Sequence, residues 1–276
     1  MHYLLHALRG ALIGSAELVP GVSGGTIALI VGIYERALDN GHRLLKGRFR
    51  EVEWGFLLAV GAGMLLAVFG LSSILHSFVE NQVSLSRALF FGMVLVSLVV
   101  PLSMIPARER FSPKNLVALL IAAAAVFVIT GFTSGTVKAP SLIVIFGAAA
   151  LAVCALILPG VSGSLILLTL GLYEPVIGAV SDRAWGTIAV FALGALVGLA
   201  IFIELLNWLL DKHRGVTLAA MAGFMLGSLR ALWPFGADQD AGIGGTLGMF
   251  VLGAAIVAAI IFAEQRLSGS KDDQPA

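Results

Sequence analysis

Charged side chains are scarce in this chain of 276 residues: only 12% are Asp, Glu, Lys or Arg, whereas 59% are hydrophobic. Soluble domains carry about 25% charged residues, so water is not the main solvent of this protein. The net charge is only +1, so the chain lacks the excess of basic residues that is typical of nucleic-acid-binding proteins. The single cysteine, Cys154, excludes an intrachain disulfide.

Sequence motifs of catalysis are also missing. The chain contains no P-loop, no nucleophile motif and no cluster of metal-ligand residues. His2 and His6 have the i, i+4 spacing of two ligands on one helix face, but two ligands at a terminus make weak support for a metal site. We therefore expect no enzyme, no metal and no cofactor.

Long apolar runs take the place of charge, and the mean hydropathy is +1.00. Runs such as residues 54–75 and 243–262 are long enough to cross the hydrocarbon core, which needs about 20 helical residues. They lack the two-residue alternation of membrane strands. Helices are then the remaining way to satisfy backbone groups in lipid, and an all-α polytopic membrane protein is predicted.

The chain contains one unit twice. Residues 20–35 read PGVSGGTIALIVGIYE and residues 159–174 read PGVSGSLILLTLGLYE, with ten of 16 positions identical. A weaker similarity continues downstream, where Trp54 matches Trp185, Gly63 matches Gly194 and Gly92 matches Gly223. Duplicated halves are common in transporters, whose binding site lies between the repeats. The predicted spans are 54–75, 86–106 and 115–132 in repeat 1–135, and 185–209, 216–234 and 246–263 in repeat 136–266.

Each PGVSG segment interrupts an apolar run. Pro20, Gly21, Pro159 and Gly160 are predicted hinges, because proline breaks a helix. Each run either crosses the membrane as a broken helix or returns as a re-entrant hairpin, over about residues 3–35 and 142–174.

The distribution of basic residues decides between these alternatives. Hairpins place 12 Lys and Arg on one side and 3 on the other, whereas full crossings give 9 and 6. The positive-inside rule favours the first division. We therefore predict two inverted repeats, each a re-entrant helical hairpin plus three transmembrane helices. The C-terminus is then cytoplasmic, with a disordered tail over residues 267–276.

The two hairpin tips offer polar groups inside the membrane. Serine stands where a helix N-cap is expected, and the amides that follow have no intrahelical partner and favour anions. The predicted substrate-binding residues of the tips are Ser23, Gly24, Gly25, Thr26, Ser162, Gly163 and Ser164. The alternative is that the glycines only permit close packing and that each serine caps its own helix.

Several charged residues fall inside apolar stretches. Glu17 is predicted to carry a coupling proton or to gate the site, because intramembrane carboxylates are costly; the alternative is an ion pair with an arginine such as Arg9. Arg230 and Arg9 match phosphate geometry, and snorkelling to the interface is the alternative. We expect a structural role for Glu204 and interfacial anchoring for Tyr34 and Tyr173.

The string Glu17–Thr26 (ELVPGVSGGT), followed by Gly32–Glu35 (GIYE), resembles the signature of the PopT family. These prokaryotic membrane proteins were long described as a domain of unknown function. The resemblance includes the second copy and nearly the whole chain, but Ser164 replaces Gly25 and Leu156 replaces Glu17 at the equivalent positions. These two replacements put the functional equivalence of the two tips in doubt.

This resemblance implies a flippase that returns undecaprenyl phosphate, or a similar polyprenyl-phosphate carrier, across the cytoplasmic membrane. The head group would lie between the hairpin tips, and a proton or sodium gradient could drive transport. The alternatives are an ion-coupled secondary transporter of a small soluble anion and a lipid phosphatase. A lipid phosphatase would need a nucleophile or a metal cluster, and the sequence supplies neither.

Overall fold

The computed structural model describes residues 2–18, 23–132, 137, 140–235 and 242–272. These ranges are helical and contain no strand. The helices are α1 (His2–Glu17), α2 (Gly24–Ile30), α3 (Tyr34–Leu45), α4 (Trp54–Asn81), α5 (Val83–Ser97), α6 (Val99–Ser103), α7 (Pro113–Ile129), α8 (Leu142–Ile157), α9 (Gly163–Thr169), α10 (Tyr173–Ser181), α11 (Trp185–Lys212), α12 (Arg214–Ser228) and α13 (Ile243–Asp272).

Four helical segments are long and apolar enough to cross a membrane: α4, α5 with α6, α11 and the part of α13 from Ile243 to Glu264. The pair α9 and α10 passes the same test together, but it is bent by 112° at a short break. Helices α7 and α8 are apolar and shorter, with 17 and 16 residues. The described chain therefore has four or five candidate spans by length and composition.

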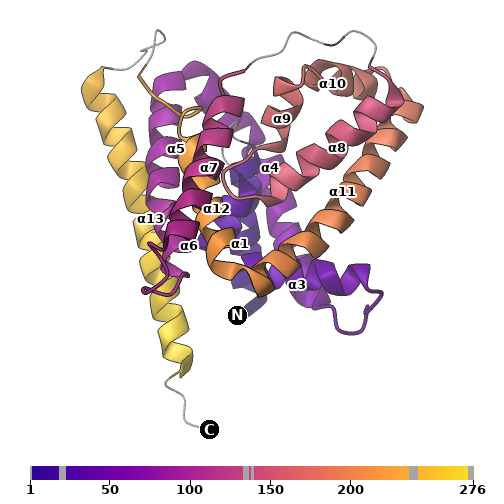
Figure 1. Ribbon diagram of the computed structural model, residues 1–276. Helices are drawn as coiled ribbons and strands as arrows, with labels where there is room; N and C mark the ends of the chain where they lie inside the picture. The colour runs from indigo at the N-terminus through magenta and orange to yellow at the C-terminus, as the bar shows by residue number, and fades with distance from the viewer. Residues whose placement is uncertain (1, 19–22, 133–136, 138–139, 236–241, 273–276) are drawn as a thin grey trace.

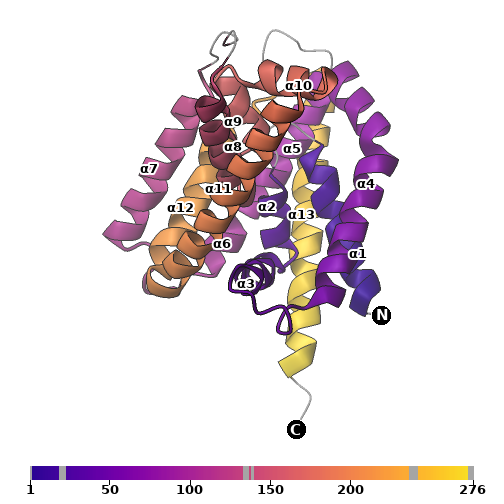
Figure 2. The same ribbon diagram turned by 90° about the vertical axis from the view of Figure 1, so that its right-hand side faces the viewer.

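The helices pack in four matching pairs (Figures 1 and 2). Helix α1 lies along α4 and α8 lies along α11, whereas α13 lies along α5 and α7 lies along α12. The last long helix of each half thus packs against the other half. Neither half buries its own apolar faces alone, so the two halves form one bundle.

Equivalent glycines permit the close approach in these pairs. Gly63 of α4 abuts the backbone of α1, and Gly194 of α11 abuts the backbone of α8. Gly92 of α5 and Gly223 of α12 abut the backbones of α13 and α7. A Cβ atom at any of these positions would collide with a carbonyl oxygen. Small residues of this kind let membrane helices approach closely where no hydrophobic driving force acts between them.

Two short helical hairpins enter the bundle from opposite ends in Figure 1. Helix α1 rises from the end that carries both termini, and α2 returns toward that end, where α3 lies across the bundle. Helices α8 and α9 make the corresponding excursion from the other end, where α10 lies across. The start of α2 and the chain after α8 meet where these excursions end, at the bonds from Ser23 to Leu158 and from Gly160 to Thr26.

The return arms α2 and α9 are short, with seven residues each. Helix α2 ends at Ile30 because Gly32 adopts a left-handed φ of 68° and the Ile33 amide donates to the Ala28 carbonyl at 3.0 Å. Such a motif ends a helix and satisfies its last carbonyls. Gly171, with a φ of 69°, ends α9 in the same way.

Helix α3 begins at Tyr34, directly after the stop, and runs to Leu45. The tail was expected to be disordered from residue 267, but α13 continues to Asp272; residues 273–276 lie outside the described part.

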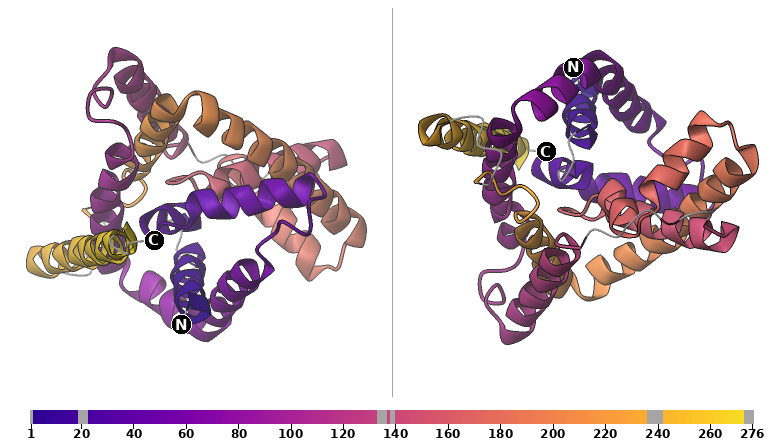
Figure 3. Two further views of the ribbon diagram at one scale, coloured as in Figure 1. Left: turned by 90° about the horizontal axis from the view of Figure 1, so that it is seen from below. Right: turned by 90° about the horizontal axis from the view of Figure 1, so that it is seen from above.

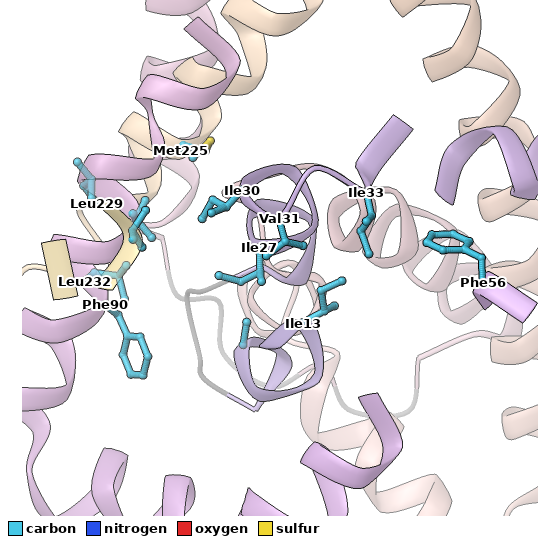
Figure 4. Packing of buried hydrophobic residues seen from close by; sticks show 13 residues of the cluster. Ile13, Ile27, Ile30, Val31, Ile33, Phe56, Phe90, Met225, Leu229 and Leu232 are labelled. Carbon is cyan, nitrogen blue, oxygen red and sulfur yellow. The ribbon is translucent and has the colours of Figure 1, made fainter. Parts of the chain in front are cut away.

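Helix α2 lies in the main hydrophobic core (Figure 4). Ile27, Ile30 and Val31 pack in one buried cluster with Ile13 of α1 and Met225 of α12. Five of the seven residues of α2 are buried, whereas only Gly163 and Leu167 are buried in α9. The first return arm is therefore a core element and the second is largely peripheral.

Candidate functional site

The first hairpin tip is built on Ser23, which caps α2. Its side chain accepts a hydrogen bond from the Gly25 amide at 3.2 Å and its hydroxyl donates to the Leu158 carbonyl at 3.0 Å. Only 1% of the Ser23 surface is exposed. The structure thus contains the self-capping that the sequence left as an alternative, together with a bond to the second hairpin.

The first tip docks against the end of α8 in the second hairpin. The Gly160 amide donates to the Thr26 hydroxyl oxygen at 2.9 Å, and the Tyr34 hydroxyl donates to the Ile157 carbonyl at 3.1 Å. Gly25 lies so close that a Cβ atom there would stand 2.5 Å from the Ile157 oxygen. These bonds satisfy orphan groups at the end of α8. Tyr34, expected at the interface, is instead buried.

Glu17 is the last residue of α1, and its side chain lies at the start of α2. Its carboxylate accepts a hydrogen bond from the Gly24 amide at 2.8 Å, and α2 is oriented so that its N-terminal amides favour an anion there. Glu17 is not bonded to Arg9, the partner considered from the sequence, because Arg9 bonds Glu264 instead. The Glu17 side chain therefore fills the place at the first tip that an anion would take.

The second tip has a different arrangement around Ser162 and Ser164. Their hydroxyl oxygens lie 2.8 Å apart, and Ser162 makes no side-chain cap for α9. Ser164 is exposed, whereas the equivalent Gly25 is partly buried against α8. Gly160 has a left-handed φ of 82°, which fits its predicted hinge position, whereas Pro20 and Gly21 lie outside the described residues.

The tips therefore meet in an offset manner. The start of α2 contacts residues 157–160, at the end of α8. Gly163, at the start of α9, instead packs against the Ala152 carbonyl within its own hairpin. Of the predicted tip residues, Ser23, Gly25 and Thr26 are thus brought against the second hairpin.

Arg230 follows α12 and lines a cavity of about 620 Å³. Its guanidinium donates to the Phe127 carbonyl at 2.6 Å and lies 4.5 Å from the centroid of the Phe127 ring. Phe91 and Trp233 complete an aromatic wall. An arginine held on a ring keeps donors that can face an anion.

Arg9 binds Glu264 of α13 through two nitrogens, at 3.2 Å from Nε and 2.7 Å from Nη2 to the same carboxylate oxygen. Sequence reasoning missed Glu264 because 255 residues separate the partners and no local pattern links them. Glu204 lies 3.3 Å from the Lys46 ammonium and 3.0 Å from His42, as its expected structural role requires.

Metal ligands do not gather in the described residues: no group of three or more His, Cys, Asp or Glu side chains could hold an ion. His6 packs edge-on against Phe56 and lies 3.3 Å from Arg36. The side chain of His2 lies outside the described part. A His2–His6 metal site therefore has no further support.

The chain combines long apolar helices with broken helices that bury polar groups at their breaks. This combination defines a multi-pass membrane protein of the transporter type. Residues 13–246 match the family described as undecaprenyl phosphate translocase-like. The chain belongs to this family, which confirms the resemblance carried by the PGVSG motifs. It is therefore a member of a transporter family and not an enzyme.

Two relatives carry the same name. A polyprenyl-phosphate transporter of Vibrio cholerae serotype O1 is 36% identical over 247 residues, which are 85% of this chain and 79% of that protein. A polyprenyl-phosphate transporter of Staphylococcus aureus (strain NCTC 8325) is 32% identical over 245 residues, which are 83% of this chain and 86% of that protein. No solved structure matches the chain.

Proposed function

We propose that this protein moves undecaprenyl phosphate, or a similar polyprenyl phosphate, across the cytoplasmic membrane so that the carrier is used again. The observation that carries the proposal is the match of most of the chain to relatives named polyprenyl-phosphate transporter. An unaided phosphate head group would lose its water in the bilayer core at a large free-energy cost. Polar groups buried at two helix breaks replace part of that water.

The two halves are proposed to be inverted repeats. The matching helix pairs, with glycines at equivalent contacts, support a two-fold relation between the halves. The entry of α1 and α8 from opposite ends supports an axis in the membrane plane. The division of basic residues, 12 against 3, supports a cytoplasmic position for α3 and the C-terminus.

The head group is proposed to bind between the tips. Ser23, Thr26, Ser162 and Ser164 supply hydroxyls, and Gly24, Gly25 and Gly163 supply backbone amides. Because the Gly24 amide is bonded to Glu17, the phosphate must displace this carboxylate or bind when it is protonated. Glu17 is therefore proposed to gate the site and to carry the coupling proton. Pro20–Gly21 and Pro159–Gly160 serve as hinges.

Arg230 and Arg9 are proposed to receive the phosphate on either side of the tips. Arg230 lines a cavity with Phe127 and Trp233, whereas Arg9 lines a different cavity together with the first residues of α3. Guanidinium groups bind phosphate oxygens in a bidentate manner. A lipid that exchanged between these two arginines through the tips would cross the bilayer.

The transport proposal is tested in liposomes that contain undecaprenyl phosphate and the purified full chain. An impermeant phosphate-directed reagent measures how much carrier reaches the outer leaflet over time. We expect the protein to accelerate equilibration severalfold over protein-free liposomes. Equal rates with and without protein would refute lipid transport, and uptake of inorganic phosphate in the same liposomes would favour a small-anion transporter.

Glu17→Gln tests the gate and the coupling proton. The amide can still accept the bond from Gly24, but it neither carries charge nor titrates. We expect an imposed pH gradient to lose its effect on the transport rate, while exchange without a gradient continues. Glu51→Gln, which changes an exposed carboxylate paired with Arg48, is the matched control. A retained response to the gradient in Glu17→Gln would remove the assigned role.

A further inference from the structure

A second polar cavity lies at the end of the bundle that carries both termini. It has a volume of about 510 Å³ and lies between α1, the turn from α2 to α3, α6 and α13. Figure 3 (left) views this end of the bundle. Arg9, Arg36 and Glu264 line the cavity, so charges from α1, α3 and α13 face one space.

The Arg9–Glu264 pair is the most enclosed charge pair in the cavity. The two side chains are only 14% and 19% exposed, and the carboxylate fills the fork of the guanidinium. A phosphate is bound by the same fork geometry. Glu264 thus occupies the position that an incoming anion would take.

Arg36 supplies a second guanidinium from a different helix. It donates to Glu53 and its Cζ atom lies 4.3 Å from the centroid of the Phe56 ring. The hydrogen bond from Arg36 lowers the pKa of the Glu53 carboxyl, so this pair is ionised at neutral pH. The Arg36 side chain is 40% exposed and keeps donors that can turn toward the cavity.

The cavity has space for a ligand beside Gly32. Gly32 lines it, and the nearest atom to a Cβ built on Gly32 is a Glu264 oxygen at 3.9 Å. The apolar part of the wall includes Ile30 of α2, Met104 beside α6 and Ile261 of α13, and it adjoins the polar side chains of Tyr34, Glu35 and Ser103. A ligand with an anionic end and an apolar chain fits this lining better than a small hydrated ion.

We propose that this cavity is a second binding station for a lipid phosphate monoester, in which Arg9 and Arg36 hold the phosphate and Glu264 is the internal counter-ion that it displaces. The inference rests on the proposed function and deepens it, because it places a resting site for the head group on the α3 side of the tips. Displacement of Glu264 would also release α1 from α13. Arrival of the lipid would therefore loosen the first hairpin.

Occupancy of the cavity is tested by protection of a single cysteine. Ser103 lines the cavity and is exposed, and Cys154 is the only native cysteine. In the full chain with Cys154→Ser and Ser103→Cys, undecaprenyl phosphate should slow modification by a water-soluble maleimide severalfold. Undecaprenol and inorganic phosphate should protect weakly. Equal protection by inorganic phosphate, or none by the lipid, would overturn the lipid site.

Affinity measurements then separate a binding role from a structural one. Arg9→Gln and Arg36→Gln should each weaken undecaprenyl phosphate binding in nanodiscs by about tenfold or more, as expected for a lost charge-assisted bond. Glu264→Gln removes the competing anion and should tighten binding severalfold. A purely structural ion pair predicts the opposite sign for Glu264→Gln, and weaker binding in that variant would refute the proposal.

Two controls lie at the same end outside the cavity lining. Arg43→Gln removes another cation 3.8 Å from Glu53, and Glu204→Gln removes a carboxylate paired with Lys46; both should leave the affinity unchanged. If the wild-type chain transports the lipid and the three cavity variants bind it normally, only the second station fails. If the wild-type chain neither binds nor transports it, the proposed function fails.

Discussion

The two hairpin tips have ten of 16 residues in common and yet lie in different surroundings. In the first tip, Ser23 and Thr26 are each 1% exposed and bond to the end of α8. In the second, Ser164 is exposed and its hydroxyl is paired with Ser162. A repeated motif therefore reproduces the backbone break, whereas its neighbours decide whether the polar groups are buried against another helix or exposed.

The largest expected difference between the tips is steric. Gly25→Ser copies the second tip into the first, but its side chain would collide with the Ile157 carbonyl. We expect a loss of about 1–3 kcal/mol of stability, as for overpacked interiors, measured by thermal unfolding in detergent. The reciprocal change, Ser164→Gly, alters an exposed position and should cost less than about 1 kcal/mol. Equal losses would show that the tips are equivalent.

Thr26→Val tests the hydrogen bond between the hairpins. The substitution preserves shape but leaves the Gly160 amide without its acceptor, and a buried unpaired donor costs about 1–3 kcal/mol. We expect a lower unfolding temperature and faster amide exchange at Gly160. Thr130→Val is the matched control, because this hydroxyl, on a partly exposed residue, donates to the Phe127 carbonyl at the end of its own helix. An unchanged exchange rate at Gly160 would argue against the docked tip.

The two motif tyrosines provide the smallest of these contrasts. Tyr34→Phe removes the bond to the Ile157 carbonyl and should cost about 1 kcal/mol. Tyr173→Phe, at the equivalent position, changes a side chain that is 40% exposed and should have no measurable effect on unfolding. A destabilised Tyr173→Phe protein would mean that the second hairpin is docked as firmly as the first.

Much of the fold follows from local pattern. The apolar runs predicted helices at the positions of α4, α5, α7, α11, α12 and α13, because a chain in lipid must satisfy its own backbone. The sequence pattern did not predict that a helix ends and a new one begins at the GIYE and GLYE ends of the motif. Their glycines end α2 and α9 and start new helices at Tyr34 and Tyr173, a stop that a continuous apolar pattern conceals.

The candidate site was less accessible to sequence reasoning. Ser23 and Glu17 were identified because polar residues beside PGVSG interrupt an apolar run. Their partners Leu158 and Gly24, and the Arg9–Glu264 pair, depend on how distant segments cross. Nothing in the residues near Arg9 indicates that α13 returns beside it.

Hydropathy, repetition and proline–glycine steps are local properties, so the order of residues alone establishes the membrane environment, the duplicated unit and the helix breaks. The three-dimensional packing establishes which backbone groups at those breaks are hydrogen-bonded. That outcome depends on packing between segments more than 100 residues apart, as in the 135 residues between Ser23 and Leu158. Two motifs with ten of 16 residues in common thus place their serines differently, because Ser23 is buried whereas Ser162 is half-buried and Ser164 is exposed.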